Sequence, residues 1–126
     1  MTDLLTLDLK GFAEQGVSIQ LKHPVTGKKL ESFITIQGAD SAEYKNAMIA
    51  VSKASSLSDK TDHEADGAKI LALITLGWTG LKFGDEEIKY SEEEAVKLYA
   101  RFGWISDQVF SAVNDRKLFL VNAKAV

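Results

Sequence analysis

Two histidines, a glycine–lysine pair and an acidic stretch are the residues of this 126-residue chain whose types could do chemistry. His63 opens the sequence His63-Glu64-Ala65-Asp66, but the zinc motif H-E-x-x-H needs a second histidine at position 67, where Gly67 stands. His23 lies far away in the sequence, next to Pro24, and is interpreted as a turn residue. We therefore predict no metal site and no cofactor at the histidines.

The segment Val25-Thr26-Gly27-Lys28-Lys29 shares only a Gly-Lys pair with a phosphate-binding loop. That motif needs a glycine five residues before Gly27, where Lys22 stands, a serine or threonine after Lys28, and then a helix. None of these is present in the sequence. We interpret the segment as the solvated tip of a hairpin.

The stretch from Asp85 to Glu94 holds six carboxylates and one lysine. It lacks the ligand spacing and the glycine of an EF-hand loop, and its last three glutamates suit the positive end of a helix dipole. Gly-x-Ser-x-Gly and cysteine are both absent from the sequence, so it offers no recognisable nucleophile. We predict no catalytic residue, and a carboxylate-based enzyme stays as an alternative because distant residues can meet in a fold.

A β-hairpin over about 17–36 is the first element that the sequence predicts. Val17–Lys22 alternates apolar and polar residues with period two, and Ser32–Ile36 is rich in β-branched and aromatic residues. Pro24 and Gly27 supply the turn between them.

Helices are predicted at about 41–55, 62–77, 92–102 and 106–117. Capping-box spacings at Asp40–Glu43, Thr61–Glu64 and Tyr90–Glu94 mark three starts, and Gly103 ends the third helix. A glycine-punctuated loop is expected around Trp78. The fold class is therefore α+β, mainly α: one domain over 1–126, with an N-terminal β-hairpin followed by a bundle of about four helices.

Composition limits the partners. Apolar residues make up 45% of the chain, enough for one core, and the formal net charge of −3 lacks the basic excess that nucleic-acid binding needs. The absence of cysteine fits a reducing cytosol. The acidic N-terminus does not resemble a secretory signal and no apolar run is long enough to span a membrane, so we predict neither export nor membrane contact.

The order of motifs resembles the tail assembly chaperones of long-tailed bacteriophages. The resemblance spans about residues 17–119 and is strongest in the second half, where a tryptophan, an acidic loop, a serine-capped helix and an Ile-x-Asp-Gln-Val helix follow in order. Its motifs are a Pro-x-Thr-Gly turn between strands, then Gly38–Tyr44, Gly77-Trp78, Tyr90–Glu94 and Trp104–Val109.

The resemblance implies a non-enzymatic protein of the host bacterial cytoplasm, absent from the mature virion. It would bind the tape measure protein, keep it soluble, help tail-tube subunits assemble around it, and act as a homo-oligomer that offers many apolar contacts at once. Five aromatic residues are the candidate partner contacts or core anchors: Trp78, Phe83, Tyr99, Phe102 and Trp104. The alternatives are a virion structural protein, such as a tail-completion or neck component, and a small metal-dependent enzyme or regulator.

Overall fold

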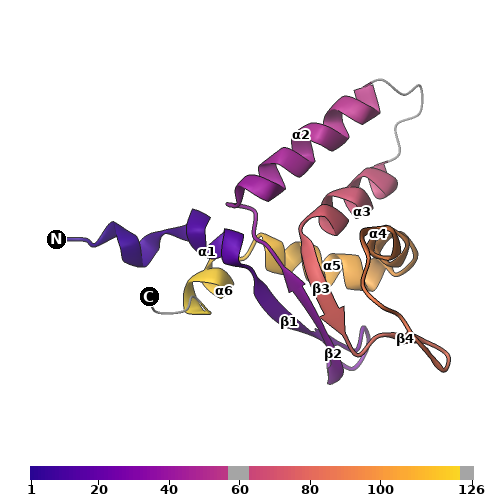
Figure 1. The fold of residues 1–126 in the computed structure, drawn as a ribbon. Coiled ribbons are helices and arrows are strands. Elements are labelled where there is room, and N and C mark those ends of the chain that lie inside the picture. The colour runs from indigo at the N-terminus through magenta and orange to yellow at the C-terminus, as the bar shows by residue number, and fades with distance from the viewer. Residues whose placement is uncertain (57–62, 123–126) are drawn as a thin grey trace.

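The computed structural model describes residues 1–56 and 63–122 of the chain (Figure 1). It is a mixed α+β fold that is mainly helical, as expected. The elements in chain order are a 3₁₀ helix η1 (Leu4–Leu7), α1 (Leu9–Gln15), β1 (Val17–Lys22), β2 (Lys29–Ile36), α2 (Ala42–Ser56), α3 (His63–Leu73), β3 (Thr75–Thr79), β4 (Lys82–Phe83), β5 (Glu86–Glu87), α4 (Glu92–Arg101), α5 (Gly103–Val113) and α6 (Arg116–Val121).

The predicted hairpin over 17–36 is confirmed, but it is not the N-terminal element, because η1 and α1 precede it. Strands β1 and β2 pair antiparallel, with Val17 opposite Ile36 and Gln20 opposite Phe33. In the connecting turn, Nδ1 of His23 accepts hydrogen bonds from the backbone N–H groups of Val25 (3.1 Å) and Thr26 (3.2 Å). His23 is therefore a turn residue.

The helix predicted over 62–77 is wrong at its C-terminal end, and position 62 lies outside the described residues. Helix α3 stops at Leu73, and residues 75–79 form β3, which pairs antiparallel with β2 in a sheet of order β1-β2-β3. The run from Ile70 to Leu76 is apolar almost all round, and such a run has no period that separates a buried helix from a buried strand. Residues 75–79 form a strand because they pair with the free edge of β2, which is far away in the sequence.

The loop expected around Trp78 is also wrong, because Trp78 lies in β3 and a short antiparallel hairpin of β4 and β5 follows. Phe83 pairs with Glu86 across a two-residue connection of Gly84 and Asp85. Gly84 has a φ of +59°, and a glycine with positive φ at the first central position is typical of a type II′ hairpin turn.

The third predicted helix, 92–102, matches α4, and the side chain of Ser91 caps it by accepting from the Glu94 N–H (3.1 Å). The fourth, 106–117, is wrong at both ends. Gly103 begins α5 instead of merely ending α4, and α5 stops at Val113. Asp115 then caps a separate helix, α6, by accepting from the Leu118 N–H at 3.3 Å, a break that apolar periodicity does not reveal.

The start of α2 agrees with the prediction of 41–55, but its cap is Ser41 and not Asp40, the first residue of the predicted capping box. The Ser41 hydroxyl oxygen accepts from the Tyr44 N–H (3.1 Å). Asp40 instead pairs with Arg116 of α6 through two hydrogen bonds of 2.9 Å, which hold the pKa of Asp40 below its ordinary value. The capping box proposed at Thr61–Glu64 begins in residues that the structure does not describe.

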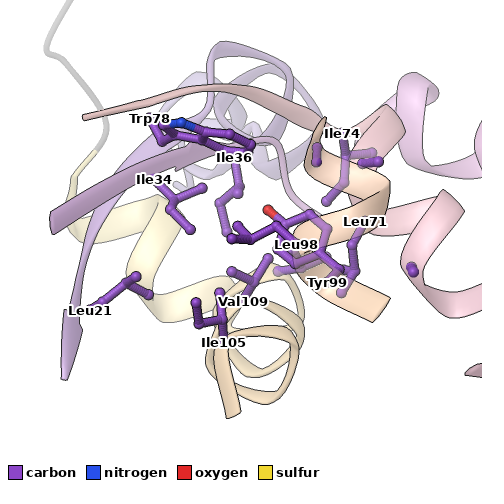
Figure 2. Close-up of a cluster of buried hydrophobic side chains, with 14 of the residues drawn as sticks. Leu21, Ile34, Ile36, Leu71, Ile74, Trp78, Leu98, Tyr99, Ile105 and Val109 are labelled. Atoms are coloured by element: carbon purple, nitrogen blue, oxygen red, sulfur yellow. The ribbon is translucent and has the colours of Figure 1, made fainter. Parts of the chain in front are cut away.

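The core lies between the sheet and the helices. Figure 2 shows sheet side chains such as Leu21, Ile34 and Ile36 meeting Leu98 of α4 and Val109 of α5, all of them buried. Helices α2 and α3 pack together beside α4, while α1 and α6 pack at the opposite end of the sheet (Figure 1). The helices therefore bury their apolar side chains against the sheet as well as against one another, so they do not form a separate bundle as predicted. Within the described residues, no helix has the length and hydropathy that crossing a bilayer requires.

Candidate interaction surface

Trp78, the first of the five candidate aromatic residues, is a core anchor. Its side chain is 9% exposed, and Nε1 donates a hydrogen bond to the Ile88 carbonyl (2.9 Å). The edge of one ring meets the face of the other in its contact with Tyr90, at a centroid distance of 5.1 Å. Trp78 therefore ties the segment between β5 and α4 to the sheet.

Tyr99 is also a core residue. Its hydroxyl lies 2.6 Å from Oγ1 of Thr75, and Thr75 Oγ1 donates to the Leu71 carbonyl (2.7 Å). Because the threonine hydroxyl has one proton and uses it on Leu71, Tyr99 must be the donor in their shared bond. Burial raises the pKa of Tyr99 to about 12.

The direction of this bond predicts unequal costs for its two partners. Thr75→Val removes the acceptor and leaves the buried Tyr99 hydroxyl unsatisfied, so we expect a loss of about 1–3 kcal/mol in the free energy of unfolding. Tyr99→Phe leaves Thr75 still donating to Leu71 and should cost about 1 kcal/mol. Urea unfolding of both variants measures the difference. A larger loss for Tyr99→Phe than for Thr75→Val would contradict the assigned direction.

The other three candidates come together at the surface. Phe83, Phe102 and Trp104 line a depression of about 220 Å³, which we call the aromatic hollow. Phe83 is 41% exposed, and Phe102 and Trp104 are half-buried. Strands β1, β2 and β4 and helices α4 and α5 supply its walls, with aliphatic side chains between the rings: Leu21, Leu30, Leu81, Ile88, Leu98 and Ile105.

Gly80 lets the chain turn from the sheet into this hollow. It has a φ of +76°, a side chain there would collide with the backbone carbonyl of Glu31, and its own carbonyl accepts from Ser32 Oγ (2.7 Å). Only glycine combines this conformation with so close an approach. The following hairpin then places Phe83 on Phe102, with ring centroids 5.9 Å apart and planes inclined by 26°.

Arg101 adds a positive charge to the hollow. Its Cζ lies 5.5 Å from the Phe83 centroid and 5.4 Å from that of Phe102, within the range of cation–π attraction. In the described part of the chain no carboxylate forms an ion pair with Arg101. A neighbouring depression that shares Phe83 and Ile88 with the hollow is lined by acidic side chains: Glu86, Glu87 and Glu94.

The candidates for chemistry do not gather into a site. The acidic stretch is divided between the β4–β5 hairpin and the first turn of α4. The side chain of His63 lies outside the described part of the structure. Among the side chains that the structure does describe, no three histidines or carboxylates are placed to share a metal ion. What the aromatic hollow offers is apolar contact, with ring faces and aliphatic walls and with the Arg101 guanidinium beside them.

Two features of the molecular surface were not predicted from the sequence, one at the aromatic hollow and one away from it. Arg101 joins the aromatic cluster only because α4 ends beside the β4–β5 hairpin. The N-terminal residues Leu4, Leu5 and Leu7 are exposed on η1, and their spacing in the first eight residues was the available signal.

Comparison of the chain with protein-family models, curated proteins and solved structures finds no significant match.

Proposed function

We propose that this chain is a non-enzymatic chaperone of bacteriophage tail assembly. It binds the tape measure protein in the host bacterial cytoplasm, promotes assembly of the tail tube around it, and leaves before the virion is mature. The observation that carries the proposal is the aromatic hollow, an exposed apolar surface built from three of the five candidate contact residues. The motif order supplies the identity of the client.

The physics of the hollow suits a chaperone. Exposed apolar surface with a polar rim is typical of a protein-binding site. Aromatic residues and arginine are the residues most enriched among those that dominate binding energy, and Phe83, Phe102, Trp104 and Arg101 are all present here. The hollow is small, so one copy makes a weak contact, and a long client is held by many copies at once. Self-association therefore belongs to the proposal.

Co-expression with a tape measure fragment tests the function. The wild-type chain is expected to raise the soluble fraction of the fragment and to co-purify with it. Phe83→Ser should reduce co-purification by about tenfold, because it removes a central ring from the contact. The matched control is Phe110→Ser, which changes a phenylalanine of α5 that is 55% exposed and does not line the hollow, and it should bind as wild type does.

An unchanged soluble fraction together with no co-purification would speak against a chaperone. Mass spectrometry of purified virions tests the second half of the proposal, since a chaperone is expected to be missing from them and a tail-completion or neck component to be present.

A further inference from the structure

Strand β1 lies at an edge of the sheet, whose strand order is β1-β2-β3 (Figure 1). At one end of this edge the side-chain amide of Gln108, in α5, bonds to the backbone of Lys22. The Lys22 N–H donates to Oε1 of Gln108 (2.9 Å), and Nε2 of Gln108 donates to the Lys22 carbonyl (2.8 Å). A neighbouring strand would make the same pair of bonds with its peptide groups. Gln108 therefore takes the place of a strand at Lys22.

Ser18 and Gln20 also direct their backbone groups to this open edge. Gln37, which directly follows β2, donates its N–H to the Ile74 carbonyl on the β3 side (2.9 Å), so the even-numbered residues of β2 point to β1. They pair with the odd-numbered residues Val17–Ile19 of β1, and Ser18 and Gln20 point away from β2. Among the described residues nothing bonds to the outward backbone groups of these two. Such an edge is a template for another strand.

A depression of about 540 Å³, which we call the β1 trough, runs beside this edge. Ile19 and Gln20 line one wall, and α5 and α6 form the other, with half-buried Ala112 and Leu118 giving it an apolar floor. The β1 trough shares no lining residue with the aromatic hollow. A strand in the trough therefore leaves the hollow open to a client.

Helix α5 determines which end of the β1 trough each charge occupies. Gln108 bonds to Lys22, so the neighbouring Asp107 lies at the hairpin end, beside the lysine of its own chain. Val113, the last residue of α5, accepts from a backbone N–H just past the C-terminal end of β2 (3.0 Å), where β1 begins. Asp115 therefore lies at the end of the trough away from Lys22.

The charges suit a second copy of β1. Placed antiparallel on this edge, it brings its Lys22, the single charged residue of the strand, to the end where Asp115 lies. In the described part of the chain Asp115 forms no ion pair. Of the cations nearby, Arg116 is bonded to Asp40, and Lys117 does not line the trough. The same contact recurs at the other end of the pair, because the two copies are equivalent.

We infer that two copies of this chain associate through the edges of their β1 strands, antiparallel, so that their sheets become one. Ser18 of each copy pairs with Gln20 of the other. At Lys22 the strand of the second copy has already ended, and Gln108 completes the edge there. The contact is isologous, with two-fold symmetry. The inference deepens the self-association in the proposed function, on which it rests, and gives each pair two hollows for one client.

Sedimentation equilibrium of the purified chain tests the contact. Because the shared edge is short, mass is measured up to a concentration of about 1 mM, where wild type should approach the mass of a dimer. Ser18→Pro removes an outward N–H and no bond to β2, a position where an edge strand tolerates proline, and it should stay monomeric. Ser18→Thr, the matched control, keeps the N–H and should associate as wild type does.

Lys22→Glu tests the charges without a change in the backbone. It places a carboxylate near Asp115 of the second copy, and the dissociation constant of the dimer should rise about tenfold. Lys29→Glu is its control, because Lys29 lies opposite Lys22 in the hairpin but does not line the β1 trough. It should associate as wild type does.

Hydrogen exchange at single amides identifies the edge that is used. The Ser18 and Gln20 amides should exchange rapidly in dilute protein and become protected as the concentration rises. The Lys22 amide, which Gln108 bonds, should be protected throughout. Circular dichroism checks that every variant is folded.

A wild-type chain that stays monomeric up to 1 mM, a folded Ser18→Pro variant that associates normally, or Ser18 and Gln20 amides whose exchange ignores concentration overturns the inference. The exchange and Lys22→Glu results hold whether or not Ser18→Pro folds. These measurements contain no client. A failed β1 contact therefore leaves the co-expression result standing, and a missing effect on the tape measure fragment leaves the β1 result standing.

Discussion

Trp78→Ala is expected to lower the free energy of unfolding by about 3–5 kcal/mol, the usual cost of truncating a buried aromatic residue to alanine. Besides leaving a cavity, the change leaves the Ile88 carbonyl without its 2.9 Å donor and the Tyr90 ring without its edge-to-face partner. Those contacts hold the segment that leads from the β4–β5 hairpin into α4. Chemical denaturation followed by far-ultraviolet circular dichroism measures the loss.

Phe83→Ala is the matched comparison. Phe83 is stacked on Phe102 and lies under Arg101, but it is 41% exposed, so its removal should cost at most about 1–2 kcal/mol. The two variants thus separate the aromatic residues that build the fold from those available to a partner. Equal losses of stability would show that the distinction between core and hollow is wrong.

Local signals account for the parts of the fold that the sequence predicted well. The alternation of Val17–Lys22 needs only its own residues to indicate a half-buried strand, and Ser91 three residues before Glu94 marks the start of α4. Strand β3 could not be found this way. Its five residues follow the apolar run of α3 almost directly and include two threonines and a glycine, so no local period marks them as a strand. They form a strand because they pair with the edge of β2, whose Ile34 lies opposite Trp78 although it is far away in the sequence.

The candidate contact residues also depend partly on local information and partly on tertiary contacts. Residue type identifies five aromatic residues that must either pack or bind, because each carries a large apolar surface. Their orientation depends on tertiary contacts: Tyr99 faces Thr75 inside the core, while the two-residue turn at Gly84 carries Phe83 outward. Arg101 becomes part of the surface only where the end of α4 and the hairpin meet. Spacing along the chain contains none of this information.

The exposed leucines at the N-terminus are the opposite case, because the sequence signal for them is local. Leu4, Leu5 and Leu7 stand between two aspartates, Asp3 and Asp8. The same pattern also places several leucines on a short capped helix, and nothing else in the described part of the fold covers them.

Alkaline pH should destabilise the protein through Tyr99. Its pKa is raised from 10.0 to about 12 in the folded state, so below pH 10 the phenol is protonated in both states. Between pH 10 and 12 the unfolded chain releases this proton first and binds fewer protons than the folded chain, so the free energy of unfolding falls as pH rises. Two units correspond to about 2–3 kcal/mol. Tyr90, whose pKa burial also raises, acts in the same direction.

Tyr99→Phe isolates the contribution of the buried phenol. The variant starts about 1 kcal/mol less stable at neutral pH, because it lacks the hydrogen bond to Thr75, but its stability should decline less steeply above pH 10. Since all other titratable groups are the same in the two proteins, the difference between their denaturation curves at successive pH values reports Tyr99 alone. The two curves should converge and then cross as pH approaches 12; parallel curves would mean that the Tyr99 hydroxyl is open to water and that the core beneath β3 is looser than its contacts indicate.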